Sequence, residues 1–160
     1  MNNLAMPRVD RKLLLKKSTV LQNLRKILKS ENILEHEDHL RPFETDALSA
    51  YKQKPMIVVF PENTLEVSKV LSYCNKEKIK VVPRGAGTGL SGGALPLEDG
   101  ILLCLSKFNK IIEIDYKNKC VVAQPGVTNL SITQAVEGHG YYYAPDPSSQ
   151  IACSIGGNVA

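Results

Sequence analysis

The sequence predicts an α+β fold in which a parallel βαβ unit comes first and an antiparallel region follows. The first observation is a pair of apolar, β-branched runs at 56–60 and 79–83, separated by a stretch of helical period. The second is a pair of apolar runs at 110–116 and 119–125, separated by only two residues. With 160 residues and 43% hydrophobic side chains, the chain can bury one core of ordinary size.

The first 30 residues carry the positive charge of the chain. They hold eight Lys or Arg against Asp10 alone, a net +7, so the overall charge of +4 leaves −3 for residues 31–160. Leu and Ile recur here at mostly helical spacing, which predicts an N-terminal leader of one or two amphipathic helices with a basic, solvated face. Such helices can associate with an anionic membrane surface. The leader has no aromatic residue for stacking, so nucleic acid is not an expected partner.

Composition also bounds the location of the chain. No apolar run approaches the roughly 18 residues of a membrane helix, and no secretory signal is visible. We therefore expect a cytoplasmic protein, with peripheral association to the inner membrane face as a further possibility. The four cysteines lie far apart, without a C-x-x-C pair, and are expected to be reduced and to pack in the core or in strands.

The elements of the first half follow from local signals. Residues 31–54 are polar and irregular and are expected to lead into the domain without forming core elements. The run at 56–60 predicts a strand buried on both faces. Asn63 and Glu66 have the spacing of an N-cap and its N3 partner, which predicts the start of a helix. The strand at 79–83 follows, so the pair of strands is expected to be parallel.

The second half changes period. A short strand is expected at 101–105, and the runs at 110–116 and 119–125 predict an antiparallel hairpin. A helix is expected to begin near Val127 or Thr128 and to end at Gly138. Residues 141–160 are polar or glycine-rich and show little regular period.

The glycine-rich stretch 85–93 follows the strand at 79–83, at the end where parallel sheets usually bind ligands. Its spacing satisfies G-x-G-x-x-G, but Pro96 stands where the dinucleotide fingerprint needs the first turn of a helix. A Walker loop is excluded because this stretch has Gly92-Gly93-Ala94 where that motif needs a Lys before Ser or Thr. The remaining prediction is a backbone nest for an anion, with Arg84 as a cation and Thr88 and Ser91 as hydroxyl donors; a glycine turn without a ligand is the alternative.

Four stretches carry a family resemblance: LRPFETDALSAY at 40–51, PRGAGTGLSGGALPLEDGILL at 83–103, QPGV at 124–127 and YYAPDPSSQIACSIGGNVA at 142–160. In this order they closely resemble the glycolate oxidase D-subunit family. More broadly they are similar to FAD-linked oxidases of the vanillyl-alcohol oxidase fold, which include D-lactate and D-2-hydroxyglutarate dehydrogenases. The resemblance spans essentially residues 40–160.

The resemblance implies a PCMH-type FAD-binding domain at 51–160, truncated at its C-terminal side, after a helical leader and lead-in segment at 1–50. It implies a parallel βαβ lobe, then an incomplete antiparallel α+β lobe, with FAD between them. The residues implied to wrap the pyrophosphate are Arg84, Gly85, Ala86, Gly87, Thr88, Gly89, Ser91 and Gly92. Those implied to line the other side of the cofactor are Pro145, Asp146, Ser148, Ser149, Ser154, Gly156, Gly157 and Asn158.

Members that bind flavin covalently use a His or Cys near the glycine loop. No His or Cys occurs between Arg84 and Gly100, so noncovalent FAD is expected. No metal site is expected.

The activity implied by the resemblance is hydride transfer from a 2-hydroxy acid, such as glycolate or D-lactate, to flavin N5. The domain that supplies the catalytic base and the substrate site lies beyond Ala160 in relatives, so the catalytic residues are unknown and the enzyme status of this chain is open. Expected partners are a small 2-hydroxy acid in the complete enzyme and further oxidase subunits or a following chain. The alternative is a truncated or decayed gene product without catalytic activity.

Overall fold

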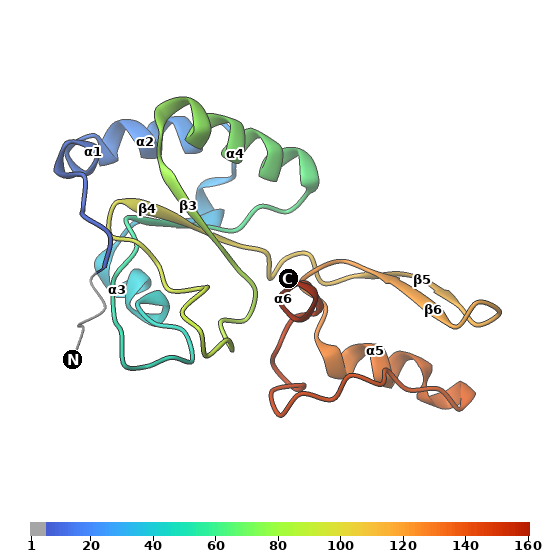
Figure 1. Cartoon of the computed structure of the whole chain (residues 1–160). Helices are drawn as coiled ribbons and strands as arrows, with labels where there is room; N and C mark the ends of the chain where they lie inside the picture. Colours follow the sequence, from blue (N-terminus) through green and yellow to red (C-terminus); the bar gives the residue numbers. More distant parts are fainter. Residues whose placement is uncertain (1–5) are drawn as a thin grey trace.

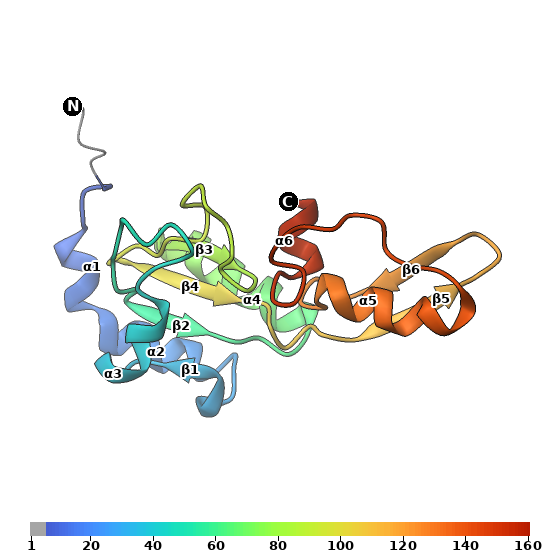
Figure 2. The same ribbon diagram turned by 90° about the horizontal axis from the view of Figure 1, so that it is seen from below.

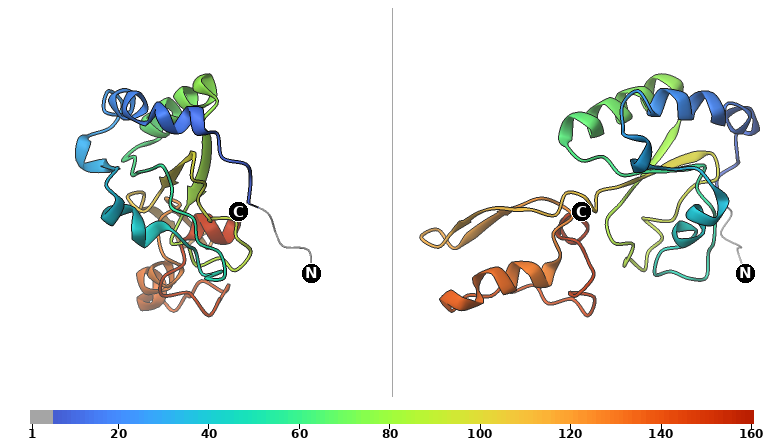
Figure 3. Two further views of the ribbon diagram at one scale, coloured as in Figure 1. Left: turned by 90° about the vertical axis from the view of Figure 1, so that its left-hand side faces the viewer. Right: turned by 180° about the vertical axis from the view of Figure 1, so that it is seen from behind.

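A computed structural model describes residues 6–160, which form two parts that lie side by side (Figures 1 and 3). The first part contains a four-stranded sheet with helices on one face and loops on the other. The second part contains a two-stranded hairpin that extends away from the first part, with a helix beside it. This mixed α+β arrangement, with a parallel unit followed by an antiparallel one, confirms the predicted fold class.

The sheet of the first part has the strand order β1-β2-β4-β3. Strands β2 (Ile57–Val59) and β3 (Lys80–Arg84) are parallel, as predicted, but each pairs with β4 (Gly100–Cys104), which lies between them. The sequence analysis expected a strand here without placing it in the parallel sheet. All five residues of β4 are buried, which is the pattern of a central parallel strand covered on both faces.

Helix α4 (Thr64–Glu77) connects β2 to β3 and begins where the sequence predicts. The Asn63 side chain accepts a hydrogen bond from the Glu66 backbone N–H at 2.9 Å, as expected of an N-cap. The helix ends at Lys78, whose φ of 56° is left-handed. Val70 and Cys74 face the core, so this helix covers one face of the sheet.

The leader forms helices α1 (Arg11–Leu15) and α2 (Lys17–Leu24), which lie on the same face of the sheet as α4 (Figure 1). The apolar side of α2 is buried in the main core through Val20, Leu21 and Leu24. The leader is therefore part of the core of the first part. The first five residues of the expected leader lie outside the described residues.

A buried carboxylate anchors the leader to the sheet. Asp99 accepts hydrogen bonds from the Asp10 backbone N–H and from Lys80 Nζ, each at 2.7 Å, and Lys80 Nζ also donates to the Arg8 carbonyl at 3.2 Å. Burial by itself would raise the pKa of Asp99, but these donors stabilise the carboxylate and hold its pKa below the ordinary value.

Residues 31–54 have more structure than the sequence indicates. A turn at Ser30–Asn32 leads into β1 (Ile33–Leu34), which pairs antiparallel with β2, and α3 (Glu37–Leu40) and a turn at Arg41–Phe43 follow. The expectation of a lead-in without core elements is therefore wrong. Elements of two to four residues are too short to show a periodic pattern, and only contact with the sheet reveals them.

A second carboxylate, Glu62, joins three segments of the first part. It accepts hydrogen bonds from Lys29 Nζ at 2.8 Å, from Asn32 Nδ2 at 3.1 Å and from Lys107 Nζ at 3.0 Å. These donors, Lys29 first, lower the pKa of Glu62 from 4.5 to about 2.

We expect this group to make folding sensitive to acid. Because the folded-state pKa of Glu62 is lowered, its contribution to stability is present above pH 4.5 and is lost as the pH falls toward 2. The Glu62→Gln variant should therefore lose less stability than the unaltered chain over this interval, measured as the urea midpoint at each pH. Glu113→Gln, which changes an exposed side chain on the hairpin, is the control; equal acid sensitivity of the Glu62→Gln and unaltered chains would contradict the prediction.

The second part contains the predicted hairpin, formed by β5 (Ile111–Asp115) and β6 (Cys120–Ala123), and the predicted helix α5 (Asn129–Val136). A turn at Glu137–His139 follows α5. The short helix α6 (Ile155–Val159) was not predicted. Its Gly156 and Gly157 have low helix propensity, so the local sequence gives no helical signal there. Figures 1 and 2 show α6 at the junction of the two parts.

The hairpin leaves its outer edges open. Within residues 6–160, β5 and β6 pair only with each other, and Ile112 and Val122 are 65% and 47% exposed. Unpaired strand edges with apolar side chains promote association. We expect the purified chain to associate in a concentration-dependent manner, measured by analytical ultracentrifugation.

Replacing both Ile112 and Val122 by Lys should reduce this association. Leu71→Lys, which changes an exposed leucine on α4, should leave it unaltered. A chain that stays monomeric at high concentration would refute the prediction. Among residues 6–160, no helix has the length and apolar character to cross a membrane.

Candidate functional site

The glycine loop begins at the carboxyl end of β3, where the sequence analysis expects it. Residues 85–99 form a loop on the face of the sheet opposite α1, α2 and α4 (Figure 1), and Figure 2 looks onto that face. The Leu105 N–H donates to the Arg84 carbonyl at 3.0 Å, so the end of β4 holds the start of the loop against the sheet. The loop therefore projects from a rigid strand end, which is a usual place for a ligand in a parallel sheet.

Most backbone N–H groups of this loop are free to donate hydrogen bonds to a ligand. Within residues 6–160, none of the N–H groups from Gly85 to Ala94 donates a hydrogen bond to a protein group, whereas the Gly87 and Gly92 carbonyls accept from Ala47 and Leu95. Gly87 and Gly92 have φ values of 73° and 75°, a left-handed conformation that glycine adopts without strain and that is typical of anion-binding backbone nests. Free N–H donors beside occupied carbonyl acceptors are suited to binding an anion.

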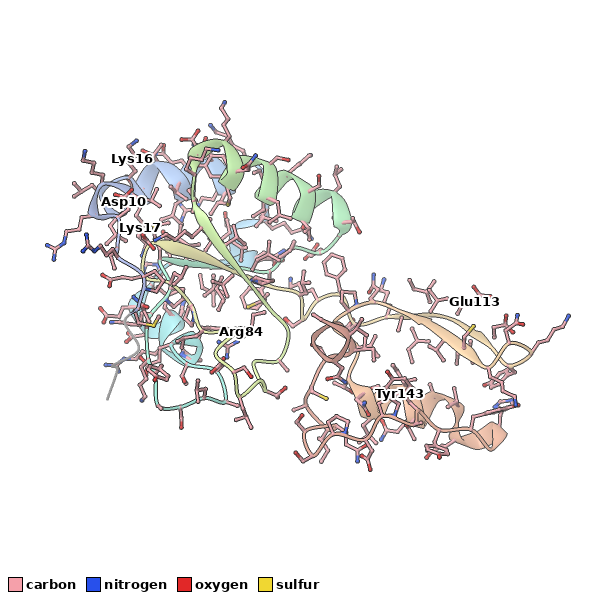
Figure 4. The ribbon with its side chains drawn as sticks, viewed as in Figure 1. Asp10, Lys16, Lys17, Arg84, Glu113 and Tyr143 are labelled. Carbon is pink, nitrogen blue, oxygen red and sulfur yellow. The ribbon has the colours of Figure 1, made fainter. Side chains whose placement is uncertain are left out.

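Arg84 supplies a positive charge at the start of the loop (Figure 4). Its guanidinium lies beside Gly87, where a Cβ would come within 2.4 Å of Nη2, and its Cζ lies 5.8 Å from the centre of the Phe43 ring. No carboxylate of the described chain lies within 4 Å of this guanidinium. A guanidinium without a carboxylate partner, next to free N–H groups, matches a pyrophosphate, which carries two negative charges.

Cys104 ends β4 close to Arg84 without being a reactive thiol. Burial raises its pKa to about 12, and the charge of Arg84 offsets only part of this effect. The thiol therefore stays protonated near neutral pH.

One residue of the second predicted set lies against the glycine loop. Ser154 is 6% exposed, and its Oγ would be 2.0 Å from a Cβ added to Gly85. Only a glycine at position 85 allows this approach. A Cβ added to Gly157 would lie 3.4 Å from the same Ser154 hydroxyl. The structure thus brings Gly85 and Ser154, 69 positions apart in the chain, into contact at the junction of the two parts.

Pro145, Asp146, Ser148 and Ser149 lie on a strap that runs beneath α5 toward α6 (Figure 1), and Gly156, Gly157 and Asn158 lie within α6. Asn129 Nδ2 donates to the Pro145 carbonyl at 2.9 Å, and the Ser149 carbonyl accepts from Ala152 and Cys153. These bonds hold the strap to α5 and to itself, and no hydrogen bond within residues 6–160 joins it to the glycine loop. Asp146, Ser148 and Asn158 are exposed, and Gly156 packs on Pro125.

A third segment that the sequence did not predict also lies at this site. Residues 43–53 lie beside the glycine loop: Ala47 N–H donates to the Gly87 carbonyl at 2.9 Å, and a Cβ on Gly92 would be 3.6 Å from Leu48 Cδ2. Arg84 Nη1 also donates to the Phe43 carbonyl at 3.4 Å. The resemblance at 40–51 was the available signal, but nothing in that stretch indicates contact with a loop 40 residues later.

A cavity of about 550 Å³ lies away from the glycine loop, between the hairpin and α5. Its lining is mostly apolar and includes Ile114, Val121, Ile132, Val136 and Tyr141. It adjoins the open hairpin, and none of its lining residues belongs to the glycine loop. The loop, not this cavity, has the chemistry of a nucleotide site.

The residues present fit FAD on two counts. The free N–H groups and Arg84 can hold its pyrophosphate, and the contact of Gly85 with Ser154 places residues of both parts next to that loop. A bound flavin would supply hydride-accepting chemistry that no side chain provides.

Comparisons with known proteins agree with this geometry. A family described as an FAD binding domain matches residues 55–160. Glycolate oxidase subunit GlcD of Escherichia coli K12 is 50% identical over 156 residues, which cover 98% of this chain and 30% of the relative. A D-lactate dehydrogenase of Anaerostipes hadrus is 41% identical over 119 residues, covering 74% of this chain and 25% of the relative.

Solved structures show the same fold. A 4-ethylphenol oxidase from Gulosibacter chungangensis superposes with a TM-score of 0.79 at 24% identity, over 96% of this chain and 30% of that one. A p-cresol methylhydroxylase gives 0.69 at 26% identity, over 82% and 26%. The chain thus spans about 30% of the length of the GlcD relatives. From the match at 55–160, together with the fold and the glycine loop, we conclude that the chain belongs to the family of FAD-binding domains.

Proposed function

We propose that the chain is the FAD-binding portion of a flavin-dependent 2-hydroxy acid dehydrogenase or oxidase that acts on glycolate or D-lactate. The observation that carries the proposal is the run of free N–H groups from Gly85 to Ala94 beside the unpaired Arg84 guanidinium. The likeness to glycolate oxidase subunits and D-lactate dehydrogenases supports the substrate class. In this proposal residues 51–160 form the FAD-binding unit, and residues 1–50 support it.

Each predicted residue then has a role toward the cofactor. The loop from Arg84 to Gly92 binds the pyrophosphate through its backbone donors and the guanidinium charge. Ser154 and the α6 glycines approach the cofactor from the second part, and the strap residues Pro145–Ser149 face the isoalloxazine. FAD is held noncovalently, which the lack of His or Cys in residues 85–99 supports.

The chemistry divides between cofactor and protein. When bound, FAD would supply the hydride-accepting chemistry that oxidation of a 2-hydroxy acid requires. This chain's contribution is to bind and orient the cofactor at the junction of its two parts. The general base that takes the hydroxyl proton and the groups that bind the substrate carboxylate are proposed to come from a following domain or a further oxidase subunit.

A chimera tests the proposal. This chain replaces the matching 30% of E. coli GlcD, and the product is assayed for bound flavin and for dye reduction by glycolate and by D-lactate, with unaltered GlcD as the positive control. We expect bound FAD that is released on acid denaturation and turnover of at least one of the two acids. A chimera without flavin would overturn the cofactor role, and a flavin-loaded chimera inactive on both acids would overturn the proposal that this chain orients the flavin for a substrate domain of this class.

We also propose a cytoplasmic location with weak peripheral association to the anionic inner membrane face, driven by the basic leader. Because the apolar side of α2 is buried in the core, charge rather than insertion would drive this association. We expect co-sedimentation with phosphatidylglycerol vesicles at low salt and its loss above roughly 0.3 M salt. A variant with exposed Lys12 and Lys16 changed to Gln should bind less; equal binding to neutral phosphatidylcholine vesicles would contradict the proposal.

A further inference from the structure

Two buried side-chain oxygens lack a hydrogen-bond partner within residues 6–160, and both belong to the 43–53 segment. They are Asp46 Oδ2 and Gln53 Oε1. Asp46 is 5% exposed. A buried carboxylate oxygen without a partner is costly to a fold, and native structures rarely keep one without a reason.

The rest of the Asp46 side chain is firmly placed. Its Oδ1 accepts a hydrogen bond from the Leu48 backbone N–H at 2.9 Å, as in an Asx turn. The next residue, Ala47, donates from its N–H to the Gly87 carbonyl at 2.9 Å. The turn therefore fixes the carboxylate next to a residue that is bonded to the glycine loop, and it occupies one carboxylate oxygen while leaving the other without a partner.

The 43–53 segment contacts the glycine loop at several positions. The Phe43 carbonyl accepts a hydrogen bond from Arg84, and the Phe43 ring lies under the Arg84 guanidinium. Leu48 lies beside Gly92. Segment 43–53 thus contacts the loop at Arg84, Gly87 and Gly92, and Asp46 lies in the chain between the residues that make these contacts.

An ionised carboxylate oxygen can form hydrogen bonds only with certain groups of a ligand. Such an oxygen only accepts hydrogen bonds, so it cannot pair with the pyrophosphate oxygens that the N–H groups and Arg84 attract. The nearest donors in a dinucleotide are the sugar hydroxyls on either side of its pyrophosphate. Carboxylates bind sugar hydroxyls of nucleotides in other folds for the same reason.

We propose that Asp46 is a positioning residue of the FAD site, whose Oδ2 accepts a hydrogen bond from a sugar hydroxyl flanking the pyrophosphate. This assignment rests on the proposed cofactor role of the glycine loop. The hydroxyl belongs either to the ribose of the adenosine half or to the ribityl chain of the flavin half.

The Asp46→Asn variant isolates the unused oxygen. Its amide oxygen can keep the bond to the Leu48 N–H, while an NH₂ group replaces Oδ2 and cannot accept. We expect the affinity of the chain for FAD, measured by fluorescence titration, to fall by about 10- to 100-fold, the effect of losing a hydrogen bond to a charged group. The unfolding midpoint without FAD should stay the same or rise, which a merely structural role of Oδ2 would not produce.

Asp38→Asn is the matched control, because Asp38 is an exposed carboxylate on α3 of the same part and should leave FAD affinity unchanged. Titrations with ADP and with FMN distinguish the two halves: weaker ADP binding in Asp46→Asn assigns the ribose, and weaker FMN binding assigns the ribityl chain. An Asp46→Asn chain with unaltered FAD affinity would overturn this assignment alone. Failure of the unaltered chain to bind FAD would overturn the cofactor role and the assignment with it.

Discussion

Replacing Gly87 with Val should abolish FAD retention, with an affinity loss of at least about 100-fold. Gly87 has a φ of 73°, a conformation that a β-branched residue adopts only with strain. A Cβ there would also lie 2.4 Å from Arg84 Nη2, so the guanidinium would have to leave its place beside the free N–H groups. The variant therefore damages both the backbone nest and the charge next to it. Flavin absorbance retained after gel filtration, together with a fluorescence titration, measures the effect.

The matched control for this variant is Gly93→Val. Gly93 lies in the same loop, its φ is outside the left-handed range, and a Cβ added to it meets no atom within 4 Å. We expect its FAD affinity to remain within about threefold of the unaltered chain, the scale of effects of less than 1 kcal/mol. Equal flavin retention by the two variants would mean that the loop does not hold the pyrophosphate.

Replacing Leu102 with Ala should lower the free energy of unfolding by about 2–5 kcal/mol. Leu102 is fully buried in β4, the strand that pairs with both β2 and β3. It packs with Leu40, Val58 and Cys104 in a cluster separate from the main core. Loss of its side chain leaves a cavity at the centre of the sheet from which the glycine loop projects. Urea unfolding monitored by circular dichroism measures the change.

Leu90→Ala provides the comparison for Leu102→Ala. Leu90 is 71% exposed in the glycine loop, so its truncation should change the free energy of unfolding by no more than about 0.5 kcal/mol. If Leu102→Ala were as stable as Leu90→Ala, β4 would not be the central strand of the folded chain.

The elements that the sequence predicts well are those with a strong local signal. The N-cap at Asn63 and the two-residue connection of the hairpin each involve residues within a few positions of one another. Segments that depend on distant partners were harder to predict. The two-residue strand β1 is recognisable only because β2 lies beside it, and α6 forms despite two glycines.

The same division applies to the candidate site. The failure of the glycine run to begin a helix, because of Pro96, is a local property, and it excluded a nicotinamide fingerprint without any coordinates. The contact of Gly85 with Ser154 and the hydrogen bond from Ala47 to Gly87 join residues 69 and 40 positions apart, respectively. Contacts between residues so far apart in the chain leave no signal in the periodicity or motif spacing of the sequence.

By itself, therefore, the sequence determined that the glycine run is a loop and not the start of a helix, and it determined the parallel unit that carries the loop and the hairpin that follows, because propensity, capping and turn chemistry act over a few residues. The tertiary structure decided that β4 lies between β2 and β3, that the apolar side of α2 is buried in the core, and that segment 43–53 contacts the glycine loop. These outcomes depend on which apolar faces of distant segments pack together, and on which of their buried polar groups form hydrogen bonds, once water is excluded. Such pairings are formed only in the folded chain.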